Sequence, residues 1–181
     1  MCEIAASILA GGIVALFSFA LATWREGRTL RVEQQQRRCL ALASFAKEME
    51  ANHRLCGSIR NSLGMEAKQL EEGNNQGFLN PITQIENGAW ALARVDLPTD
   101  LLKDSDLLRR LEIIDSKERE INQMLRTREN FRIQHLTTDP QFLVTTLIGF
   151  RRIIDYPLGD LSNRIEEALP LLEPYLSGKN T

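Results

Sequence analysis

The sequence is poor in the residues that usually mark a binding or catalytic surface. Aromatic side chains make up 6% of the 181 residues, too few for stacking platforms that bind bases or sugars. The 22 lysines and arginines are balanced by 24 aspartates and glutamates, which excludes a broadly cationic nucleic-acid-binding protein. Eleven glycines and six prolines are too few for a collagen-like or low-complexity chain. The remaining class is a globular protein with one ordinary domain, or with a smaller domain and an appendage.

Known catalytic and metal-binding motifs are also missing. The sequence contains no Gly-x-Ser-x-Gly, phosphate-binding loop or dinucleotide fingerprint. Glu50 and His53 form half of a di-iron carboxylate site. The second half fails, because Arg132 stands three residues before His135. His53 and Cys56 likewise provide only half of a zinc site. We therefore predict no catalytic, metal-ligating or cofactor-binding residue, and interpret His53 and Cys56 as core side chains of a protein that is not an enzyme.

The N-terminal segment departs from the average composition. Ile4–Trp24 is a run of 21 residues without a charge. As a helix it spans about 31 Å, close to the roughly 30 Å hydrocarbon core of a bilayer. Trp24 ends the run, where an indole is favourable at the headgroup boundary. We predict a transmembrane helix within residues 1–24. A cleaved signal peptide and a buried soluble helix are the alternatives, since Ala20-Leu21-Ala22 resembles a cleavage site.

The charges on either side of this segment predict its orientation. Glu3 precedes the segment, whereas five arginines follow it closely: Arg25, Arg28, Arg31, Arg37 and Arg38. Positive residues stay on the cytoplasmic side of a membrane. We therefore expect a single-pass protein of the cell membrane, with its N-terminus outside and its bulk in the cytoplasm. Arg25, Arg28 and Arg31 lie one helical turn apart, where we expect them to contact anionic lipid headgroups. A role in setting the membrane topology alone explains these arginines equally well.

Small residues within the segment share one face of the predicted helix. Their spacings are four, four, three and four residues, in the order Ser7, Gly11, Ala15, Ser18 and Ala22. Such a stripe lets two helix backbones approach closely in lipid. About half of the segment is Ala, Gly or Ser, so a stripe also arises by chance. The expected partners are membrane lipids and either a second copy or another membrane protein, and not nucleic acid.

The rest of the chain has helical patterning throughout. Residues 25–41 contain no proline and predict a helical connector that continues from the membrane. From Leu42 onward, nine positions with a 3–4 spacing form a coiled-coil or bundle seam, seven of them apolar. The nine positions are Leu42, Phe45, Met49, Asn52, Cys56, Ile59, Leu63, Glu66 and Leu70. A polar, glycine-containing loop at Glu71–Gly77 ends this helix.

Capping residues and prolines predict where further helices begin and end. Asn80-Pro81 predicts the start of a helix that contains Trp90 and ends before Pro98. A short turn leads to a long helix from Ser105 to His135, and its predicted inner face is Leu108, Leu111, Ile114, Ile121, Leu125 and Phe131. Thr138-Asp139-Pro140 starts the next helix. Pro157 is expected to interrupt it, and a closing helix is expected from Gly159 to Pro170–Pro174.

These elements predict an all-α protein with a transmembrane segment at 1–24, a connector at 25–41, and a tail at 177–181. Residues 42–176 are expected to form an antiparallel bundle of four to five helices. Trp90, Leu107–Ile114 and Ile121–Leu125 resemble small uncharacterised prokaryotic proteins with one N-terminal membrane helix and a cytoplasmic helical domain. The likeness covers Asn87–Arg132, implies the same architecture and transfers no active-site residue.

The sequence therefore favours a membrane-anchored interaction or scaffold module that binds proteins at the cytoplasmic face. Two alternatives stay open. The first is an oligomeric effector that perturbs the bilayer or forms a pore, although the span has no ionisable residue to line an aqueous path. The second is an accessory subunit of a membrane enzyme.

Overall fold

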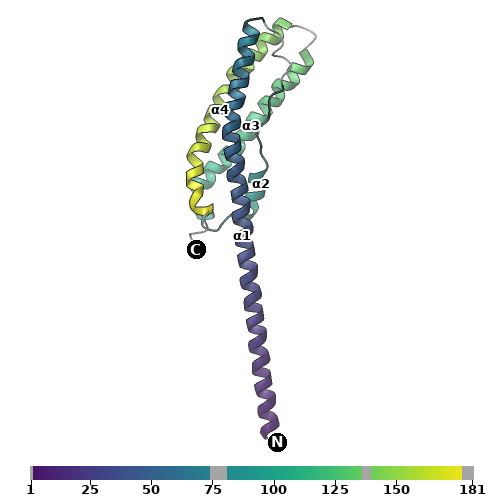
Figure 1. The fold of residues 1–181 in the computed structure, drawn as a ribbon, viewed down its shortest axis with the longest axis vertical. Helices are drawn as coiled ribbons and strands as arrows, with labels where there is room; N and C mark the ends of the chain where they lie inside the picture. Colours follow the sequence, from purple (N-terminus) through teal and green to yellow (C-terminus); the bar gives the residue numbers. More distant parts are fainter. Residues whose placement is uncertain (1, 74–80, 136–139, 177–181) are drawn as a thin grey trace.

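A computed structural model describes residues 2–73, 81–135 and 140–176, with side chains described at 19, 21–73, 81–135 and 141–176. Helix α1 (Cys2–Glu71) is a single helix of 70 residues. Helices α3 (Ser105–His135) and α4 (Pro140–Leu176) lie along its C-terminal half, and its N-terminal part projects from this bundle (Figure 1). The described residues contain no strand, so the all-α prediction is confirmed.

The long helices are connected by an extended return. Helices α1 and α3 run in the same direction, and α4 packs against both of them in the opposite direction (Figure 1). Between α1 and α3 the chain returns through a non-helical segment, residues 81–88, which we call the strap. The short helix α2 (Ala89–Ala93) and two 3₁₀ turns, η2 (Arg94–Asp96) and η3 (Leu101–Lys103), follow it. A helix starting at Pro81 was therefore a wrong prediction, and the short turn before Ser105 is the η3 turn.

Two asparagines hold the strap in its extended form. The side chain of Asn122 accepts the N–H of Ile85 at 2.8 Å and donates to its carbonyl oxygen at 2.8 Å. Asn52 pairs in the same way with Glu86, at 3.0 and 2.7 Å. Because the strap is not helical, its peptide groups have no helical hydrogen-bond partners. The two asparagine side chains supply partners for the peptide groups of Ile85 and Glu86 instead. Because Asn52 is on α1 and Asn122 is on α3, the strap is bonded to both helices.

The seam predicted on α1 forms one wall of the core. All nine of its positions are buried, including the two polar residues Asn52 and Glu66. The opposing walls come from α3 and α4, where Leu111, Ile154 and Leu161 are fully buried. Trp90 of α2 packs on Phe45 with ring centroids 4.9 Å apart. Helix α1 ends at Glu71. Gly73 follows it with a φ of 76°, a conformation that glycine adopts at little cost.

Helix α3 has the bounds that the sequence predicts. The carboxylate of Asp104 accepts the N–H of Leu107 at 3.0 Å, an N-cap that favours a start at Ser105. Four positions of the predicted inner face are buried: Leu111, Ile114, Ile121 and Leu125. The other two, Leu108 and Phe131, are only partly buried and pack against the core clusters.

Helix α4 is longer than predicted, because Pro157 does not interrupt it. Three prolines lie inside the helix: Pro157, Pro170 and Pro174. A proline frees the carbonyl group four residues earlier, and for Pro157 that residue is the exposed Ile153, where water can bind the freed oxygen. Ile154 and Leu158 on the inner face are fully buried, and their packing offsets the roughly 3 kcal/mol cost of an internal proline. The separate closing helix from Gly159 was therefore a wrong prediction.

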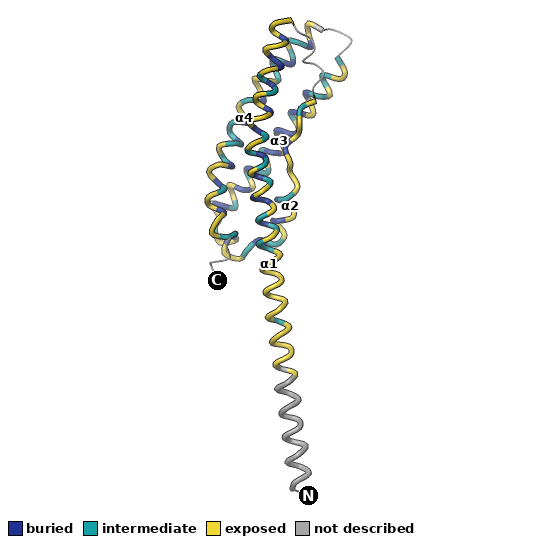
Figure 2. The backbone as a smooth tube through the Cα atoms, in the orientation of Figure 1, coloured by how far each residue is buried: buried dark blue, intermediate teal, exposed yellow. Residues whose placement is uncertain are grey.

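The N-terminal part of α1 lies outside the bundle. From Leu21 to Gln36 its described side chains are exposed, except for the intermediate Gly27 (Figure 2). Over the residues that the structure describes, no helix combines the length and the apolar composition of a membrane span. Most side chains of Ile4–Trp24 lie outside the described set. The same holds for the loop after Gly73, the cap residues Thr138 and Asp139, and the tail at 177–181.

Replacing Asn122 tests the role of the strap. In Asn122→Ala the buried N–H and carbonyl groups of Ile85 lose their partners, and each unsatisfied group costs about 1–3 kcal/mol. We expect the free energy of unfolding to fall by about 2–4 kcal/mol, measured by urea denaturation with circular dichroism. The control is Asn163→Ala on the exposed face of α4, which is expected to stay within about 0.5 kcal/mol. Equal stability of the two variants would show that the strap is not held by Asn122.

Candidate functional site

The residues that the sequence singles out for metal or thiol chemistry have structural roles. The Nδ1 atom of His53 lies 3.2 Å from the carbonyl oxygen and 3.1 Å from the hydroxyl of Ser162 on α4. Cys56 is fully buried, and burial, followed by the charge of Glu118, raises the pKa of its thiol to about 12. A thiol with this pKa stays protonated and is a poor nucleophile. Among the described residues, no three His, Cys, Asp or Glu side chains are placed to hold a metal ion.

A carboxyl group lies inside the bundle beside the strap. Glu118 of α3 has 0% exposure, and its Oε1 atom accepts a hydrogen bond from Nδ2 of Asn52 at 2.7 Å. Burial raises the pKa of Glu118 from 4.5 to about 8, the charges of Glu48 and Asp115 act in the same direction, and the Asn52 hydrogen bond opposes them. Glu118 is therefore protonated at neutral pH.

Glu48 connects this interior to α2. Its Oε2 atom accepts the N–H groups of Gly88 at 3.2 Å and Ala89 at 2.9 Å. Gly88 is the N-cap of α2 and Ala89 is its first residue, and N–H groups at this end of a helix have no partner within the helix itself. Glu48 thus fixes the point at which the strap becomes α2. The second oxygens of Glu48 and Glu118 have no hydrogen-bond partner among the described atoms.

A second polar contact lies further along the same two helices. Arg128 of α3 has 0% exposure, and its guanidinium donates a hydrogen bond to Glu66 of α1. Glu129 stands 3.6 Å from another nitrogen of Arg128. Burial raises the pKa of Glu66, against the lowering effect of Arg128. An ion pair of this kind contributes little net stability, but removal of one member leaves a costly buried charge.

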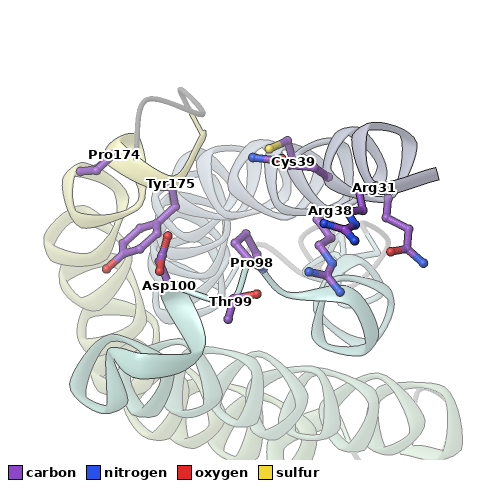
Figure 3. Close-up of a pocket in the computed structure, with 10 residues that line it drawn as sticks. Arg31, Arg38, Cys39, Pro98, Thr99, Asp100, Pro174 and Tyr175 are labelled. Atoms are coloured by element: carbon purple, nitrogen blue, oxygen red, sulfur yellow. The ribbon is translucent and has the colours of Figure 1, made fainter. Parts of the chain in front are cut away.

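A cavity of about 360 Å³, lined mostly by polar residue types, lies where α1 leaves the bundle. Its wall combines residues of α1, the segment at 98–100 and the end of α4 (Figure 3). Arg31 and Arg38 lie on one side, and Asp100 and Tyr175 on the other. The charges near the cavity are partly neutralised, because Nε of Arg38 lies 3.4 Å from Asp96. Asp100 is likewise 3.0 Å from the ammonium group of Lys103.

The three arginines after the predicted span lie on the exposed surface of α1. The guanidinium carbon of Arg28 is 5.4 Å from the ring centroid of Trp24, a cation–π contact. Arg31 belongs to the wall of the cavity, and Arg25 lies about one turn before Arg28. Of the predicted small-residue stripe, Ala22 is exposed. Its other four members, Ser7, Gly11, Ala15 and Ser18, have side chains outside the described set.

No known protein family, curated protein or solved structure matches this chain. Its function is therefore inferred from its own geometry. The polar residues that sequence reasoning did not single out, Glu118 and Arg128, bond to α1 in the interior, whereas the cavity lies at the junction of α1 with the bundle.

The stability of the chain should depend on pH through Glu118. The folded-state pKa of about 8 lies above the ordinary 4.5. The stability associated with this group is therefore complete below pH 4.5 and falls up to pH 8, by about 1.4 kcal/mol per pH unit. Glu118→Gln keeps the hydrogen-bond acceptor for Asn52 and removes the ionisable group. We therefore expect the free energy of unfolding of this variant to change less with pH and to exceed that of the parent at pH 8.

Urea unfolding in mild detergent, followed by fluorescence in a Trp24→Phe background, measures this effect because Trp90 then remains as the core reporter. Glu166→Gln, on the exposed side of α4, is the control and should retain the slope of the parent. An unchanged slope in Glu118→Gln would contradict the raised pKa.

Proposed function

We propose that this chain is a single-pass, membrane-anchored interaction module. In this proposal Ile4–Trp24 spans the cell membrane, the N-terminus is outside, and the bundle lies at the cytoplasmic face. The proposal is supported by the 21 uncharged residues of this segment, by the arginines that follow it, and by Trp24 at the boundary. The module works by assembling with a second copy or with another membrane protein.

The observation on which the proposal rests is the continuity of α1. One helix extends from Cys2 to Glu71, so the predicted anchor and the core seam belong to one continuous helix. Residues 25–41 lie between them and extend about 25 Å as a helix. A bundle attached in this way is held at a defined distance from the membrane and in a defined orientation. These are the properties that a scaffold for other membrane-associated proteins needs.

The arginines at the start of the exposed segment support the same proposal. Arg25, Arg28 and Arg31 would lie near anionic headgroups, where each contributes about 1 kcal/mol of attraction. The cation–π contact between Arg28 and Trp24 places a cation beside the residue that we assign to the boundary. Lipid headgroups are thus the first partners of the module, before any protein.

Cysteine labelling in intact cells tests the topology. Cys2 precedes the predicted span and Cys39 follows it, and Cys39 is a free thiol. We expect a membrane-impermeant thiol reagent to modify Cys2 and to leave Cys39 unmodified until the cells are permeabilised. Modification of Cys39 from outside, in a Cys2→Ser variant, would overturn the orientation.

Replacing Gly11 tests assembly within the membrane. Gly11→Ile inserts a branched side chain at the centre of the Ser7–Ala22 stripe, where backbones would approach closely. Membrane-helix contacts contribute roughly 1–2 kcal/mol, so association should weaken about ten-fold while insertion is retained. A transmembrane-association reporter measures this effect. Ile13→Leu, off the stripe, is the control and should match the parent. Equal signals from Gly11→Ile and the parent would remove the stripe as an interface.

A further inference from the structure

An apolar groove lies on the exposed part of α1, away from the core. Its volume is about 490 Å³, and five residues of α1 alone line it: Val32, Gln35, Gln36, Cys39 and Leu40. None of the five is charged, although Arg31, Glu33, Arg37 and Arg38 are interspersed with them in the sequence. Leu40 is 70% exposed and Val32 is 49% exposed. This surface is therefore uncharged and partly apolar within a segment that is otherwise rich in charge.

The groove is in register with the small-residue stripe of the predicted span. The stripe spacing of three and four residues continues from Ala22 through Arg25, Thr29, Val32, Gln36 and Leu40. The mean spacing from Ser7 to Leu40 is close to that of an 11-residue repeat, which is typical of helices that supercoil with a right-handed twist. Arg25 is the single charge on this line, and its long side chain can reach the headgroups. The hydroxyl of Thr29 is satisfied by the carbonyl oxygen of Arg25 at 3.0 Å.

The chemistry of the groove fits a second copy of the same helix. A glutamine amide both donates and accepts hydrogen bonds, so Gln35 and Gln36 are complementary to themselves across a two-fold axis. Uncharged residues at this surface also avoid the like-charge repulsion that identical charged faces would suffer. Above Leu40 the same side of α1 becomes charged, with Lys47, Glu50 and Arg54 exposed, which sets the upper limit of the surface.

The stability of α1 gives an independent argument for a partner. A helical segment as short as residues 25–36 is marginal in water when nothing packs on it, and these residues are exposed apart from the intermediate Gly27. Gly27, Thr29 and Val32 lower the helix propensity further. A second helix along Val32–Leu40 would bury the exposed apolar side chains and stabilise the segment. Gln35 and Cys39 also border the cavity beside the bundle, so the second helix would lie along Val32, Gln36 and Leu40, which line only the groove.

We propose that the Ala22–Leu40 line of α1 is a homodimer contact, formed in parallel by two copies inserted in the same membrane. The inference rests on the proposed function, which supplies the common orientation of the two chains. It extends the contact beyond the bilayer, so that the two helices lie side by side up to the base of both bundles.

Disulfide trapping of the full chain in native membranes tests this surface. Cys2 and Cys39 are first changed to serine, while the buried Cys56 is kept. Leu40→Cys places a thiol on the contact line, and Leu30→Cys places one at a second exposed leucine, with 59% exposure, that lies about 80° from Leu40 and about 160° from Val32 around the helix. Both positions are solvent-exposed, so neither variant disturbs the core. A mild oxidant and non-reducing electrophoresis then measure the dimer fraction.

We expect several-fold more disulfide-linked dimer from Leu40→Cys than from Leu30→Cys. Equal yields, or none from Leu40→Cys, would overturn the contact line. The Gly11→Ile reporter separates this outcome from failure of the proposed function. If Gly11→Ile weakens association while Leu40→Cys does not cross-link, assembly is confined to the membrane. If neither effect occurs, both the homodimer contact and the stripe interface are refuted.

Discussion

Two polar contacts inside an apolar interior determine how α1 and α3 align. Asn52 bonds to Glu118, and Glu66 bonds to Arg128. All four side chains are buried. A slip of either helix along the other would separate the buried Arg128 from Glu66 and leave only Glu129 of its own helix beside it, which is costly for a buried charge. Helices α1 and α3 both pack against α4, and these directional polar contacts between α1 and α3 favour one register of the two helices.

The strap follows from the parallel arrangement of α1 and α3. A chain that leaves the top of α1 has to return to the base of the bundle before α3 can begin beside it. Residues 81–88 make this return without forming a helix, and Asn52 and Asn122 satisfy their buried peptide groups. Asn52 bonds to the strap and to Glu118 with the same amide. The register of the helices and the path of the strap are therefore coupled through one side chain.

The sequence predicts the parts of this fold that depend on local periodicity. The 3–4 spacing on α1 identified the whole buried face, and the bounds of α3 were correct because Asp104 caps it. The strap was missed because Asn80-Pro81 is a good helix start, and the tertiary contacts that oppose it come from residues remote in sequence. The continuity of α4 was missed for a similar reason, since burial of Ile154 and Leu158 outweighs the local effect of Pro157. Glu118 and Arg128 could have been found in the sequence, because they occupy positions in the 3–4 spacing of buried residues on α3 that are otherwise mostly apolar. Asn52 and Glu66 occupy such positions on α1.

The central claim is that α1 is a rigid connection between the membrane-proximal segment and the bundle. It is tested most directly by the distance between spin labels at Glu26→Cys and Lys47→Cys, in full chains without Cys2 and Cys39 and diluted with unlabelled chains in lipid. The two positions are 21 residues apart, which corresponds to about 32 Å along an unbroken helix. The account predicts one narrow distribution near that distance. A broad distribution at shorter distances would show a hinge or an unfolded linker below the bundle and would contradict the account.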